Sequence, residues 1–383
     1  MYARHRENVA FTVVVTVAVA LGAVAVLLLL ALSGAPSITL LATVLAALPV
    51  GPLVAAFLWL DRYEPEPKRL LALALAWGAC VATMAALVVQ GLGGVLVGFT
   101  STVSLAVVAP VTEEASKGIF LLLLLWWRRA EVDGILDGIV YAGMVGVGFA
   151  FFENILYLAA AYNGADGMAP GGIAGITSTF VVRCLFSPFA HPLFTAFLGV
   201  GVGIAVTTRS PAARVLAPIS GYLAAVLAHG LWNGSTVYGF GSFVVVYAVL
   251  MAPALAGMIA LALWARNAER GMLTVALQDA AGRGLIPATD IAWVVDLRAR
   301  RSARRHARAV GGEQAAQAMR DYQIAAVELG YLHHRLLRGT APRDWQSRGQ
   351  DFLARIQSSR PQFAFPGQIV PGQIGGAAVG GQR

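Results

Sequence analysis

The sequence predicts an all-α, polytopic membrane protein with about eight transmembrane helices and a cytoplasmic, basic, helical tail. Of its 383 residues, 58% are hydrophobic and only 13% are charged, which is too apolar for a soluble protein of this size. Several apolar runs exceed the roughly 18 residues that a helix needs to cross a bilayer. Among the segments that connect these runs, only every second one carries basic residues, a pattern typical of multi-pass membrane proteins.

Eight apolar segments are long enough to be spans. The first follows Arg4 and Arg6 and is too long for the core of a signal peptide, so we expect it to be retained. The sixth contains Pro188 and Pro192, and we expect a kink or break there because proline lacks a backbone N–H. The expected spans are 9–32, 38–60, 70–90, 101–127, 135–160, 174–207, 213–237 and 243–265.

The distribution of basic residues predicts the orientation in the membrane. The segments after spans two, four and six carry lysine or arginine, as do both ends of the chain. The opposite set of segments, 33–37, 91–100, 161–172 and 238–242, contains neither. The positive-inside rule therefore places both termini in the cytoplasm, and we expect the cell (plasma) membrane as the location.

We expect three regions in the chain. A membrane domain occupies 1–265, with its functional motifs in 101–237. A cytoplasmic basic helical tail follows at 266–360. The last region, 361–383, is rich in glycine, proline and glutamine, a composition typical of disorder.

The tail carries the whole net charge of +8, because 17 basic and 9 acidic residues follow Ala265. We expect the arginines of 298–308 to contact anionic lipid, and nucleic acid is not the expected partner. Gly311-Gly312 should interrupt the helical pattern. The expected tail helices are 288–309, 313–338 and 344–358.

Charged residues in the middle of one span are the main functional signal. Glu113, Glu114 and Lys117 lie in the otherwise apolar segment 101–127. Each charge at a bilayer centre costs at least about 2.5–3.5 kcal/mol on insertion scales, so such residues are functional by default. On a helix, Lys117 can pair with either glutamate. An ion pair that only helps helices to pack needs one glutamate, so the second indicates chemistry.

The next three spans add polar residues. Glu153 is a third intramembrane carboxylate, either catalytic or paired with Arg183 or Lys117. His191 lies between two prolines that loosen its helix and leave room for water or an extended peptide. His229 and Asn233 are four residues apart and share a helix face, where they either bind an oxyanion or tie helices together.

These residue types suit the hydrolysis of a peptide bond. The reaction needs a base for water, a proton for the leaving amine and donors for the oxyanion. We expect the paired carboxylates to exchange one proton between base and acid roles, with no cofactor. The alternative is a zinc site formed by Glu113, Glu114, His191 and His229. Proton-coupled transporters also contain buried charges, but this chain shows no duplicated halves.

Together these motifs resemble those of the PrsW family of intramembrane proteases. The family is similar to the CAAX prenyl endopeptidases and to bacteriocin-processing membrane proteases, which have an arginine in place of Lys117 at a different spacing and a catalytic histidine where Glu153 stands. The motifs are Glu113-Glu114-x-x-Lys117, Phe149-x-x-x-Glu153-Asn154, His191 after Pro188, and His229-x-x-x-Asn233.

The resemblance implies an intramembrane endopeptidase whose substrates are membrane-anchored single-pass proteins, such as anti-sigma factors. Because the site residues extend from mid-membrane towards the outer face, we expect cleavage near the outer side. The candidate catalytic residues are Glu113, Glu114, Glu153, His191, His229 and Asn233, and the supporting residues are Lys117, Phe149, Asn154 and Arg183.

Overall fold

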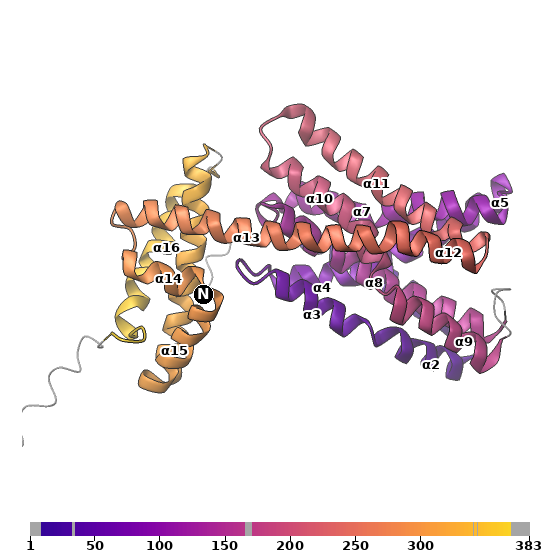
Figure 1. The fold of residues 1–383 in the computed structure, drawn as a ribbon, viewed down its shortest axis with the longest axis horizontal. Helices are drawn as coiled ribbons and strands as arrows, with labels where there is room; N and C mark the ends of the chain where they lie inside the picture. The colour runs from indigo at the N-terminus through magenta and orange to yellow at the C-terminus, as the bar shows by residue number, and fades with distance from the viewer. Residues whose placement is uncertain (1–8, 33–34, 165–170, 340, 343, 369–383) are drawn as a thin grey trace, which may run out of the picture. The chain divides into compact units, whose positions relative to one another are not determined.

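The computed structural model describes residues 9–32, 35–164, 171–339, 341–342 and 344–368, which fold into helices with no strand among them (Figure 1). This confirms the predicted all-α class. The chain separates into two compact units. The membrane unit contains the described residues of 9–61 and 65–265, and the tail unit contains 62–64 and the described residues from Arg266 onwards.

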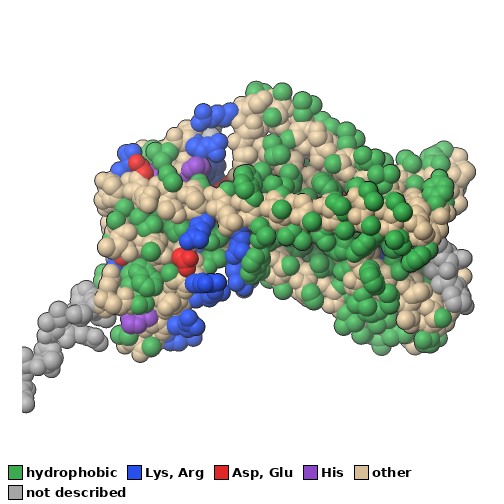
Figure 2. Space-filling view, in the orientation of Figure 1, with side chains coloured by type: hydrophobic (Ala, Val, Ile, Leu, Met, Phe, Trp, Pro, Cys, Tyr) green, Lys and Arg blue, Asp and Glu red, His purple; other side chains and the backbone are tan. Residues whose placement is uncertain are grey.

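Seven helical segments in the described part of the chain are long and apolar enough to cross a membrane. Hydrophobic side chains are spread over the whole visible face of the membrane unit, as expected for a surface in contact with lipid (Figure 2). The segments are α1 (Val9–Leu32), α2 (Pro36–Ala47) with α3 (Val50–Leu60), α4 (Lys68–Ala76) with η1 (Trp77–Ala82) and α5 (Thr83–Val97), α8 (Ile135–Tyr162), α9 (Gly172–Phe180) with η4 (Val181–Phe186) and α10 (Ala190–Thr207), α11 (Pro211–Val237), and α12 (Phe240–Val246) with η5 (Tyr247–Met251) and α13 (Ala252–Gly282).

The remaining expected span is the one that holds the charged residues. It consists of α6 (Ser101–Val103), η2 (Ser104–Val108) and α7 (Ala109–Trp127). The segment is helical from end to end. Its two glutamates and one lysine make it too polar to be counted with the seven segments that composition alone identifies as spans. The charges that mark this helix as functional therefore also weaken its signal as a span.

Helix α8 forms the core of the membrane unit. It is buried along most of its length and packs closely against α10. Small residues make this approach possible, because a Cβ atom on Gly146 would come within 2.8 Å of the carbonyl oxygen of His191. On the facing helix, a Cβ on Gly199 would lie 2.7 Å from that of Ala142. The small residues Ala142 and Gly146 of α8 thus allow the close packing that fixes the backbone carrying His191.

The sixth predicted span is broken, as its prolines indicate. The helix η4 ends at Phe186, and Ser187 has φ −129° and ψ 35°, which is not helical. Helix α10 begins at Ala190, so Pro192 lies in its first turn, where a backbone N–H has no intrahelical partner. The break places His191 at the start of a new helix inside the unit.

The tail unit has an apolar core of its own, built from the end of α13, α14 (Ile291–Val295), α15 (Leu297–Leu337) and α16 (Trp345–Ser359). The carboxylate of Asp296 accepts hydrogen bonds of 2.8 Å from the backbone N–H groups of Arg298 and Ala299, which caps α15. Gly312 has φ 70° and interrupts α15 at the predicted Gly311-Gly312 position.

Residues 361–368, where the sequence predicts the start of a disordered end, pack into the tail core. The rings of Phe363 and Phe365 are buried and lie edge-on to Tyr322, with ring centroids 5.3 and 6.0 Å away. Arg360 binds the buried carboxylate of Asp290 at 2.7 Å. The packing of the two phenylalanine rings and the Arg360–Asp290 contact order this segment although glycine and proline surround it. The rest of that predicted region, 369–383, lies outside the described residues.

Candidate active site

Helix α7 places three charged side chains inside the membrane unit. Glu114 and Lys117 are fully buried, and Glu113 is 5% exposed. The Nζ atom of Lys117 lies 2.7 Å from Oε1 of Glu114 and 3.9 Å from Oε2 of Glu113. Of the two pairings that helix geometry allows, the i,i+3 pair is thus the close one. Glu114 is neutralised by this contact, whereas Glu113 has no cation within hydrogen-bond distance in the described structure.

Lys117 also connects α7 to the two helices that face it. Its Nζ atom lies 3.1 Å from Nδ1 of His191 on α10. The same ammonium group sits 3.8 Å from the centre of the Phe149 ring on α8, a cation–π contact. Phe149 therefore helps to hold Lys117 in place. It lies one helical turn before Glu153 on α8.

Glu153 is held from two sides. Its Oε2 atom lies 2.6 Å from Nε2 of His191 and forms an ion pair with Arg183 on η4. Arg183 also donates to Oδ1 of Asn154 at 2.8 Å. Its guanidinium group lies 3.9 Å from the centre of the Tyr157 ring. Glu153 thus makes the pairing with Arg183 considered from the sequence and at the same time orients His191.

His229 is oriented by the second glutamate of α7. Its Nδ1 atom lies 3.0 Å from Oε1 of Glu114, and its Nε2 atom lies 3.7 Å from Oε2 of Glu113. The imidazole stacks on the Phe194 ring, with centroids 4.7 Å apart, and meets the His191 ring edge-on at 5.1 Å.

Each histidine therefore has a carboxylate on one ring nitrogen. The carboxylate accepts a hydrogen bond from the N–H group at that nitrogen, so the neutral ring carries its lone pair on the other nitrogen. For His229 this is Nε2, on the side of Glu113, and for His191 it is Nδ1, beside Lys117. Carboxylates that fix a histidine tautomer in this way are typical partners of metal-binding histidines.

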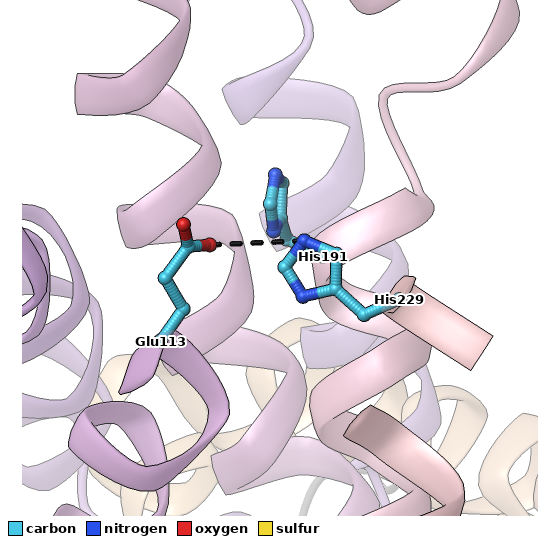
Figure 3. Close-up of side chains that lie close together, drawn as sticks. All are labelled: Glu113, His191 and His229. Atoms are coloured by element: carbon cyan, nitrogen blue, oxygen red, sulfur yellow. Dashed lines mark ion pairs between the residues drawn. The ribbon is translucent and has the colours of Figure 1, made fainter. Parts of the chain in front are cut away.

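Glu113, His191 and His229 turn their side chains towards one another (Figure 3). Each offers one ligand atom, and the three atoms lie within 4.8 Å of one another. Within the described structure, Oε2 of Glu113 is buried without a hydrogen-bond partner. A tetrahedral zinc ion, with bonds of about 2.0–2.2 Å, holds its ligand atoms roughly 3.4 Å apart, so a small closure suffices. Two imidazoles and one carboxylate also form the ligand set of known catalytic zinc sites, so these residues fit a divalent ion.

Two expected residues have other contacts. Asn233 donates to the backbone oxygen of Leu105 at 3.1 Å, so its amide ties α11 to η2. In the π-helical pattern of η2 that oxygen would accept from residue 110, which is a proline and has no N–H. Glu114, expected among the zinc ligands of the alternative, is instead engaged by Lys117, His229 and Thr195.

Two contributors to the site are absent from the sequence-based set. Nε2 of Gln90 on α5 donates to Oε1 of Glu113 at 3.2 Å. The hydroxyl of Thr195, one helical turn after His191, donates to Oε2 of Glu114 at 3.0 Å. The sequence held a signal for both, because Gln90 is an isolated amide in the apolar segment 68–97 and Thr195 shares a helix face with His191.

Fold and site together define a class, a multi-helix membrane protein with a buried centre of carboxylate and imidazole groups. A family model described as "PrsW family intramembrane metalloprotease" matches residues 66–258, which include every residue of this centre. The chain belongs to the PrsW family.

Two relatives named "Protease PrsW" are also similar. The one from Oceanobacillus iheyensis is 32% identical over 132 residues, which cover 34% of this chain and 54% of the relative. The one from Geobacillus kaustophilus is 28% identical over 151 residues, 39% of this chain and 60% of the relative. The chain thus spans little more than half the length of the curated relatives it matches. No solved structure matches it.

Proposed function

We propose that this protein is an intramembrane endopeptidase that hydrolyses peptide bonds of membrane-anchored proteins. The observation that carries the proposal is the buried Oε2 atom of Glu113, which lacks a hydrogen bond and faces two histidines inside a membrane unit. A carboxylate oxygen in this position is suited to accept a proton from a water molecule. The names of the family and of the two relatives support the same activity.

Each side chain has a role in this proposal. Glu113 takes a proton from the attacking water and returns it to the leaving amine. Lys117 holds Glu114, and Glu114 in turn holds the ring of His229. Glu153 holds the ring of His191 through its Nε2 atom. The result is a preorganised centre whose rings and carboxylate move little during the reaction.

The same residues support a metal-dependent version of the reaction. Glu113, His191 and His229 would hold the ion. The tautomer set by Glu114 leaves the Nε2 lone pair of His229 for it, and Nδ1 of His191 would bind the ion once the Lys117 ammonium group, 3.1 Å away, turns aside. A zinc ion held there would lower the pKa of a bound water and polarise the substrate carbonyl. The donor set favours this version over the metal-free one expected from the sequence.

Cleavage of purified single-pass membrane peptides in liposomes tests the proposal. The wild-type protein should cleave some of them, and Glu113→Gln should lower the rate at least about a hundredfold while the protein stays folded. Ion flux through the liposomes without any cleavage would instead support a transporter.

Chelation separates the two versions of the chemistry. Activity that disappears with a chelator and returns with added zinc would establish the metal-dependent version. Activity that persists after exhaustive chelation, with no metal detected in the protein, would establish glutamate-activated water alone.

A further inference from the structure

The carboxylate of Glu113 has two oxygens in different surroundings. Oε1 accepts a hydrogen bond from Nε2 of Gln90 at 3.2 Å. Oε2 has no hydrogen bond in the described structure and faces Nε2 of His229 at 3.7 Å. The hydrogen bond at Oε1, together with the Lys117 ammonium group 3.9 Å from Oε2, therefore fixes which oxygen is turned towards the histidines.

The orientation of the Gln90 amide follows from its neighbours. Its Nε2 atom lies 3.2 Å from both Oε1 of Glu113 and Oγ1 of Thr112. The Thr112 hydroxyl donates its own proton to the backbone oxygen of Val108 at 2.8 Å, so it presents a lone pair to Gln90. Two acceptors on the same side require the NH₂ group there rather than the amide oxygen.

Gln90 stands in an otherwise apolar helix, and it belongs to a different helix from Glu113. Placing an amide there without partners would destabilise the helix, a cost that its two hydrogen bonds offset. The amide of Asn233, the other candidate donor, is engaged with Leu105. Gln90 is thus the amide that contacts the reacting carboxylate.

We infer that Gln90 is a positioning residue of this site, which holds Oε1 of Glu113 so that Oε2 is presented to the water and to the histidines. The inference rests on the proposed peptidase function, and it is the same whether Oε2 acts as a base or as a metal ligand. Gln90 acts through Glu113 and does not itself bind the peptide.

The test compares Gln90→Met, which keeps the shape of the side chain and loses the donor, with Thr83→Val. Thr83 lies on the same helix and is buried, and its hydroxyl donates to the backbone oxygen of Gly78 at 2.9 Å rather than to a side chain of the site. The Gln90→Met change should lower kcat about tenfold to hundredfold, the usual effect of losing a hydrogen bond to a charged group, with KM within about twofold. The Thr83→Val protein should have the wild-type kcat.

A second readout needs no substrate. Modification of Glu113 by a carbodiimide, followed by mass spectrometry, should become at least about threefold faster in Gln90→Met, because the carboxylate loses the group that covers Oε1 and fixes its rotamer. A Gln90→His variant, which restores an N–H donor, should recover part of the lost kcat.

The outcomes are distinguishable. Failure of the wild-type protein to cleave any peptide would count against the proposed function, while the carbodiimide rates would still test the contact. A wild-type enzyme that cleaves, together with a Gln90→Met variant of equal kcat and equal labelling rate, would overturn the inference.

Discussion

Lys117 joins three of the helices that form the site. Its ammonium group is fully buried and contacts Glu114, His191 and Phe149, which come from three helices. Removing one member of a buried ion pair leaves the other charge without compensation, which costs more than the pair itself contributes.

The Lys117→Ala change should therefore lower the free energy of unfolding by about 3–5 kcal/mol, and Lys117→Arg should lower it less because the charge remains. Thermal unfolding in detergent measures both. Lys68→Ala, which removes an exposed lysine from the start of α4, is the matched control and should melt like the wild type. If Lys117→Ala unfolds at the same temperature as Lys68→Ala, the buried ion pair contributes nothing to stability.

At the scale of helices, the site is positioned by the packing of α8 against α10. A Cβ atom on Gly146 would lie 2.6 Å from Cα of Pro192 and 2.8 Å from the carbonyl oxygen of His191. These are backbone atoms that do not move aside as the end of a flexible side chain does. An added methyl group must therefore push the two helices apart at the first turn of α10, which carries His191.

We expect Gly146→Ala to destabilise the protein by about 1–3 kcal/mol, as overpacking usually does, and to reduce peptide cleavage at least tenfold. Gly94→Ala on α5 adds the same methyl group where nothing lies within 4 Å, so its stability and activity should equal or slightly exceed the wild-type values. Thermal unfolding and peptide cleavage, measured side by side on Gly146→Ala and Gly94→Ala, test this prediction. Equal behaviour of the two variants would show that the close approach of α8 and α10 does not position His191.

At the scale of the whole molecule, orientation and site depth together predict where a substrate is cut. A transmembrane helix hides its peptide bonds in backbone hydrogen bonds, so cleavage requires a segment that unwinds. Unwinding costs least near a helix end, where water satisfies the released groups. The distribution of basic residues predicts both termini in the cytoplasm, and in that orientation we expect the site residues to extend from mid-membrane to the outer half.

We therefore expect cleavage in, or just outside, the outer third of a single-pass substrate, with a shortened stub left in the membrane. Helix-breaking residues near that point should speed the cut, and a run of leucines should slow it. Mass spectrometry of the products locates the bond. Products cut on the cytoplasmic side of the span would contradict either the orientation or the place of the site.

The sequence by itself determined the membrane class, the positions of the helices and most of the residues at the site. These properties are local. Hydropathy over some twenty residues is sufficient to predict a span, and a buried charge is conspicuous because few other residues in a span are polar. The break before His191 was readable for the same reason, because Pro188 and Pro192 act on their own backbone.

Tertiary structure alone decided which partner each of those residues contacts, and so which role each is suited to. Adjacent glutamates on a helix point about 100° apart, so only the packing of α7 against its neighbours determines that Glu114 meets Lys117 and His229 while Glu113 keeps an oxygen without a hydrogen bond. The partners of Asn233 and Gln90 are backbone and side-chain atoms more than 20 residues away. Such contacts are set by how whole helices face one another, which no local pattern in the sequence encodes.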